Sequence, residues 1–167
     1  MRSEHVTTLW QGIYTGLAGY ATTVVLLAAS DAVAGRPFFY TPALLGSALF
    51  YGLRDPAQLV VWAGPVIAYN AAHLIVFLIF GMVAASLAYV SERGPQMWYL
   101  GLCLFLLFTF HLLAAMLAFT ERVRAAMPMW TVTGATVAAV ITMIAYLLFA
   151  HPRLRHESRH GNDSGTD

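Results

Sequence analysis

The sequence predicts an all-α integral membrane protein, a bundle of four membrane-spanning helices with one further short helix. Two observations support this class. Hydrophobic residues make up 59% of the 167 residues and charged residues only 10%, against about 25% charged residues in an ordinary soluble domain. The nine arginines all lie between or beyond long apolar runs, as a hydrocarbon solvent requires. This composition excludes a soluble globular domain, a disordered protein and a nucleic-acid-binding protein.

Four apolar runs are long enough to cross a membrane as helices, because about 20 apolar residues reach across the hydrocarbon core. The runs do not alternate with period two, which argues against barrel strands. The first run is too long for the core of a signal peptide, so we expect it to remain as a span. The four runs predict one transmembrane domain over residues 1–151, followed by a disordered polar tail over residues 152–167. The expected spans are about residues 9–34, 57–90, 97–120 and 129–150.

The second run exceeds one crossing of the bilayer. About 34 helical residues would extend about 51 Å, against a hydrocarbon core of about 30 Å. Asp55 and Pro56 are typical of a helix start, as a cap and a first helical residue. Pro65 removes one backbone hydrogen bond donor, so we expect it to kink the helix.

A short helix is predicted over about residues 42–51, between the first two spans. Thr41 and Pro42 are typical of a cap followed by the first helical position, and Gly52 is a natural stop. About ten residues are too few to cross the bilayer. The helix therefore lies in the membrane interface or re-enters the membrane, and the aromatic residues 38–40 favour the interface.

Pairs of small residues four apart recur in the spans. Such pairs let helix backbones approach closely, which drives helix association in lipid. We expect them to pack the helices of one bundle rather than to form a dimer face. The pairs are Gly12 and Gly16, Gly81 and Ala85, Ala114 and Ala118, and Gly134 and Ala138.

Two histidines lie inside predicted spans, His73 in the second and His111 in the third. Because consecutive spans run antiparallel, the helical rise places both imidazoles at nearly equal depth. Two depth-matched imidazoles are typical of a b-type haem with two axial histidines. Tyr69 and Asn70 share the His73 face by helical spacing, and we expect them beside the cofactor. In these two histidines the chain resembles bis-histidine membrane cytochromes, which would make it an electron-transfer protein with no metal other than the haem iron.

Two other roles for the histidines stay open. Either histidine could bond a neighbouring side chain or carbonyl and serve only the structure. Alternatively, both could belong to a small proton or ion transporter, since an ionisable group inside a membrane marks a functional site by default. Asp31 and Glu121 lie near the ends of the first and third spans. Asp31 could cap a helix end or bond the loop that holds Arg36, and Glu121 reads as a solvated helix end.

The sequence carries no nucleophile motif, paired-carboxylate motif or phosphate-binding loop, which argues against an enzyme. The function we predict is therefore that of a structural or accessory subunit of a larger membrane complex. Its partners would be the lipid bilayer and other membrane subunits or further copies of the chain, with no nucleic acid. We expect a bacterial-type inner membrane. An even number of spans places both termini on one side, and a slight excess of arginine favours the cytoplasmic side.

Overall fold

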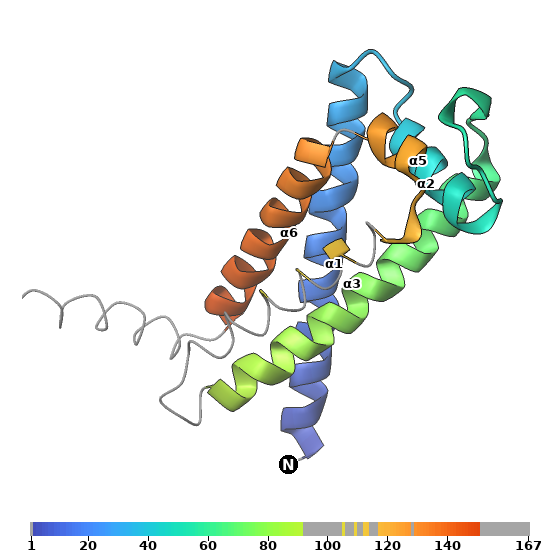
Figure 1. Ribbon diagram of the computed structural model, residues 1–167. Coiled ribbons are helices and arrows are strands. Elements are labelled where there is room, and N and C mark those ends of the chain that lie inside the picture. The colour runs from blue at the N-terminus through green and yellow to red at the C-terminus, as the bar shows by residue number, and fades with distance from the viewer. Residues whose placement is uncertain are drawn as a thin grey trace, which may run out of the picture.

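The computed structural model describes residues 2–91, 105, 109, 112–113, 117–127 and 129–150. Every regular element in this part of the chain is a helix. Three long helices lie against one another, and two short ones gather near one end of them (Figure 1). The elements are α1 (Arg2–Val33), α2 (Tyr40–Phe50), the 3₁₀ turn η1 (Pro56–Gln58), α3 (Ala63–Ser91), α5 (Glu121–Ala126) and α6 (Met129–Ala150).

Within the described ranges, three helices are long and apolar enough to cross a membrane. Their apolar segments contain 27, 28 and 21 residues, and about 20 residues suffice for one crossing. Large apolar side chains cover their outer surfaces; Val25 on α1 and Ile141 on α6 are 64% and 61% exposed. Such surfaces suit lipid rather than water, and the all-helical architecture of the described residues is that expected of a membrane protein. The three segments are Thr7–Val33, Ala63–Val90 and Trp130–Ala150.

The second spanning helix begins at Ala63, so the prediction that it starts near residue 57 is wrong. Residues 57–62 instead complete the turn η1 and continue without helical structure. The predicted cap at Asp55 is confirmed, but for η1: its Oδ1 accepts a hydrogen bond from the Ala57 amide at 3.1 Å. Pro65 lies in the first turn of α3, where a backbone N–H has no intrahelical partner. It therefore interrupts no helical hydrogen bond there, and the reason for the expected kink disappears.

Most of the predicted third span, residues 97–120, lies outside the described residues, as does the predicted tail, residues 152–167. The isolated residues described between 105 and 118 are helical. The predicted spans over residues 9–34 and 129–150 coincide with the helices α1 and α6, each of which is long and apolar enough to cross a membrane. A bundle of four spanning helices is not confirmed.

Helices α1 and α3 approach each other closely, and glycines make this possible. A Cβ atom added to Gly12 would lie 2.8 Å from Met82 Cα, and one added to Gly16 would lie 2.9 Å from Leu78 Cα. A Cβ on Gly81 would collide with the backbone of Gly12. The prediction that these small residues pack one chain together is confirmed for this pair of helices.

Helix α6 packs on the other described helices through one apolar face. A Cβ added to Gly134 would meet nothing within 4 Å among the described residues. The buried residues of α6 recur every four positions instead, so the other described helices contact α6 through a face that does not include Gly134. The prediction that Gly134 and Ala138 pack the bundle stays a prediction. Alanine and larger apolar side chains fill the contact with α1 and α3. The buried face of α6 consists of Ala135, Ala139, Met143 and Leu147.

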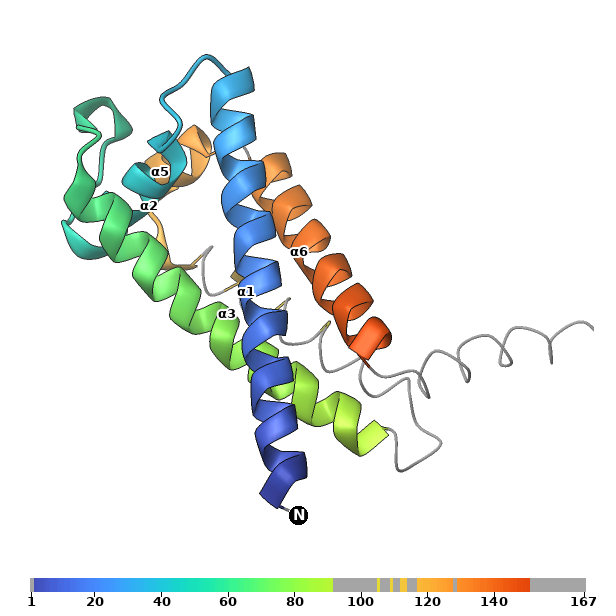
Figure 2. The ribbon, with the colours of Figure 1, turned by 180° about the vertical axis from the view of Figure 1, so that it is seen from behind.

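Helix α2 is buried by protein, which distinguishes it from a helix lying free on a membrane surface. Its residues Thr41–Ser47 are all buried, and it packs chiefly on α3, with α5 close by (Figure 2). Leu44 and Leu45 form a second core there with Val123 of α5 and its neighbours. A helix that is apolar on all sides is stable when other parts of the protein bury it, as α3 and α5 do here. Exposed aromatic residues are instead found in the flanking segments, such as Phe39 and Tyr51.

Candidate functional site

Three rings contact one another along one face of the N-terminal half of α3. Tyr69, His73 and Phe77 are spaced four residues apart, so they lie on the same side of the helix. The Tyr69 and His73 ring centroids are 5.0 Å apart with nearly parallel planes, and Phe77 meets His73 edge-on, also at 5.0 Å. The prediction that Tyr69 shares the His73 face is confirmed. The imidazole is thereby held between two aromatic rings of its own helix.

Helix α1 adds a polar contact to this cluster. The Tyr20 hydroxyl donates a hydrogen bond to Asn70 Oδ1 at 3.0 Å, and the Asn70 side-chain amide donates to the Val66 carbonyl at 2.8 Å. The Tyr20 ring also lies beside His73, with centroids 6.4 Å apart. Asn70 thus joins α1 to α3, and it lines the same small cavity as His73.

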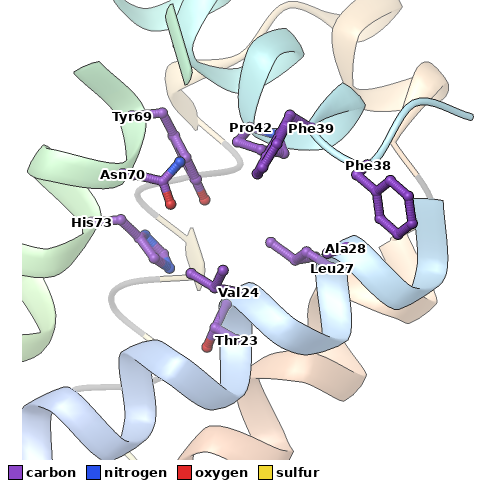
Figure 3. A pocket seen from close by; sticks show the side chains of 10 residues that line it. All are labelled: Thr23, Val24, Leu27, Ala28, Phe38, Phe39, Pro42, Tyr69, Asn70 and His73. Atoms are coloured by element: carbon purple, nitrogen blue, oxygen red, sulfur yellow. The ribbon is translucent and has the colours of Figure 1, made fainter. Parts of the chain in front are cut away.

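A small cavity lies between α1, the segment leading into α2, and α3 (Figure 3). Its volume is about 20 Å³, close to the space that one water molecule needs. Most of its wall is apolar, with polar groups concentrated on the α3 side. It is lined by Thr23, Val24, Leu27, Ala28, Phe38, Phe39, Pro42, Tyr69, Asn70 and His73.

This cavity is far too small for a flat macrocycle. His111, the second predicted axial ligand, lies outside the described residues. The pairing of His73 with His111 stays a prediction, as does a haem held by Tyr69 and Asn70. Among the described residues, no group of three or more histidine, cysteine or acidic side chains is placed to hold a metal ion.

A second polar cluster lies where α1 meets α2. Asp31 is 1% exposed, and its two carboxylate oxygens accept hydrogen bonds from the Thr41 amide at 2.8 Å and from the Thr41 hydroxyl at 2.7 Å. The carboxylate therefore satisfies a free N–H at the start of α2 and lies at the positive end of its dipole. Of the two roles considered for Asp31, its side chain fills the first by capping α2, and its main-chain carbonyl fills the second by accepting a hydrogen bond from the Arg36 amide. Glu121 is exposed and begins α5.

Sequence reasoning missed Tyr20. Its position in the middle of an apolar span could have indicated it, since a buried tyrosine hydroxyl usually has a hydrogen-bond partner. The identity of that partner depended on which faces of α1 and α3 meet. Glycine spacing alone did not determine those faces.

Comparison with known proteins adds no relative. No protein-family model, no curated protein and no solved structure matches the chain.

Proposed function

We propose that the chain is a structural or accessory subunit of a larger membrane complex, which crosses the bilayer four times. The fourth crossing is provided by residues 97–120, which carry a further apolar run. Both termini then lie on one side, and the chain forms a single transmembrane domain. A bacterial-type inner membrane is the expected location.

The observation that carries this proposal is that polar side chains inside the spans form hydrogen bonds between the helices. Hydrogen bonds join the helices in pairs: Tyr20 bonds Asn70, and two hydroxyl pairs connect α1 to α6. Interhelical bonds of this kind fix the packing of a bundle and contribute about 0.6 kcal/mol each on average. The hydroxyl pairs are Thr22 with Thr142, at 3.3 Å, and Ser30 with Thr131, at 3.1 Å.

The dimensions of the site support the same function. Ligand sites usually enclose about 300–1,000 Å³, whereas the cavity beside His73 measures about 20 Å³. An electron carrier with a haem or a transporter with a hydrated path would need far more space. The described geometry gives neither alternative support.

Photocrosslinking in native membranes tests the proposal. A photoreactive residue replaces Val25 or Ile141, both outward-facing, and the matched control replaces Ala139, which is fully buried. A structural subunit predicts a discrete crosslink to one partner protein from an outward position and none from position 139. Crosslinks to lipid alone from both outward positions would contradict a subunit role.

The alternatives are tested on the same preparation. A subunit without cofactor gives no Soret absorption band after purification from haem-replete cells. Its liposomes show the same proton flux with and without the substitution His73→Ala. A Soret band that disappears in His73→Ala and in His111→Ala would establish the haem protein instead.

A further inference from the structure

The segment that follows α1 is held in a defined position by its backbone. Gly35 has a φ of 67°, and the Gly35 and Arg36 amides donate to the carbonyls of Ala32 and Asp31 at 3.0 and 2.8 Å. This is the hydrogen-bond pattern of a Schellman motif, which glycine permits because it adopts the left-handed conformation. The turn therefore fixes where the chain leaves the helix and where Arg36 lies.

The length of α1 places Arg36 at the level of the lipid headgroups. The spanning segment of 27 residues ends at Val33 and extends about 40 Å, longer than a hydrocarbon core of about 30 Å. Arg36 follows three residues later. Phosphate groups are found at that level of a bilayer, beyond the hydrocarbon core.

The Arg36 guanidinium lies over an aromatic ring, and no carboxylate of the described residues forms an ion pair with it. Its central carbon is 4.9 Å from the Tyr40 ring centroid. Its Nη1 atom is buried and has no hydrogen-bond partner among the residues that the structure describes. The Asp31 carboxylate, five residues earlier in the chain, accepts hydrogen bonds from Thr41. A buried charged donor without an acceptor is unfavourable, so this position calls for an anionic oxygen from outside the described chain.

Exposed apolar side chains flank this cation. Val33, Phe38 and Phe39 are 91%, 63% and 54% exposed, and Phe38 and Phe39 line the small cavity with Leu27 (Figure 3). A free phosphate ion would gain nothing from contact with this apolar surface, because it carries no apolar group. A phospholipid presents a phosphate and acyl chains together and matches both features.

We propose that Arg36 binds the phosphate of an anionic phospholipid, whose acyl chains lie against Phe38 and Phe39. The planar guanidinium donates paired N–H groups to two phosphate oxygens, as arginine does in phosphate recognition. The Tyr40 ring beneath the guanidinium holds its plane in place. The site goes beyond the proposed subunit role and does not depend on it.

Titration of the full chain with phosphatidylglycerol in detergent, followed by native mass spectrometry, tests the site. Arg36→Gln should weaken phosphatidylglycerol binding about tenfold or more, because a charge-assisted pair is lost. Arg54→Gln is the matched control: Arg54 is exposed at the same end of the protein, and its loss should change the affinity less than about twofold. Equal affinities of the wild type and Arg36→Gln would overturn the proposal.

Two further ligands identify what is recognised, and they need only the wild-type chain. Diacylglycerol, which lacks the phosphate, should bind at least about tenfold more weakly than phosphatidylglycerol. Inorganic phosphate at millimolar concentration should leave phosphatidylglycerol bound. Equal binding of diacylglycerol would show that the phosphate is not recognised, and complete displacement by inorganic phosphate would show a free-phosphate site. Both measurements use the wild-type chain, so they test whether a phospholipid phosphate is recognised even if Arg36→Gln fails to fold.

Discussion

Asp31, near the end of α1, caps the N-terminus of α2 by accepting hydrogen bonds from both the amide and the hydroxyl of Thr41. The two residues are buried and ten positions apart in the chain. The contact attaches the short helix to the first spanning helix. It thereby also positions the segment between them, which holds Arg36 and Phe38.

Replacing Asp31 by asparagine should destabilise the protein. An asparagine offers one acceptor oxygen to the Thr41 amide, and the Thr41 hydroxyl must turn to accept from the asparagine NH2. The substitution therefore removes the negative charge that strengthens both bonds at the start of α2. We expect a loss of about 1.5–3 kcal/mol, as is typical for hydrogen bonds to charged groups, measured by thermal unfolding in mild detergent. Asp55→Asn is the control, because the Asp55 side chain is 39% exposed and lies 3.5 Å from Arg122; its effect should stay below about 1 kcal/mol. Equal stabilities of the two variants would contradict the capping role.

Adding one methyl group should have opposite effects at two glycines. Gly16→Ala introduces a Cβ 2.5 Å from the Phe77 carbonyl oxygen, and forcing α1 from α3 should reduce stability by about 1–3 kcal/mol. Gly134→Ala meets no atom within 4 Å among the described residues, and the helix propensity of alanine should make it neutral or stabilising by up to about 1 kcal/mol. Unfolding midpoints in one detergent compare the two. A harmless Gly16→Ala would mean that α1 and α3 do not meet at this position.

Removing the Tyr20 hydroxyl should have a small but measurable effect. Tyr20→Phe breaks the bond to Asn70 while keeping the ring, so we expect a loss of about 0.6 kcal/mol, and at most about 1.7 kcal/mol. Tyr14→Phe is a suitable comparison, since Tyr14 is on the same helix and 51% exposed. If a double-mutant cycle of Tyr20→Phe with Asn70→Ala gave no coupling energy, the bond would contribute nothing to stability.

Much of the architecture could be predicted from the sequence, because a hydrocarbon solvent leaves few choices. Apolar length alone determined the spans that became α1 and α6. The start of α3 was misplaced because residues 59–62 are apolar without being helical. Hydropathy measures preference for lipid and does not distinguish a helix from an extended segment beside it.

The site was harder to predict than the spans. Helical spacing correctly grouped Tyr69 with His73, since both lie on one helix. The partner from α1, Tyr20, depended on the crossing of two helices, which no local pattern specifies. Gly134 shows the same limit: the small-residue spacing was present, but the neighbouring helices contact α6 through Ala135 and Ala139.

The sidedness of single cysteines, introduced with Cys103 replaced by serine, tests the central claim most directly. Cysteines at positions 57 and 122 should react with a membrane-impermeant maleimide from one side of the membrane, and cysteines at positions 3 and 158 from the other. That pattern is the one an even number of crossings requires. Labelling of positions 3 and 158 from opposite sides would contradict four crossings, and free labelling at position 141 would contradict a membrane-embedded α6.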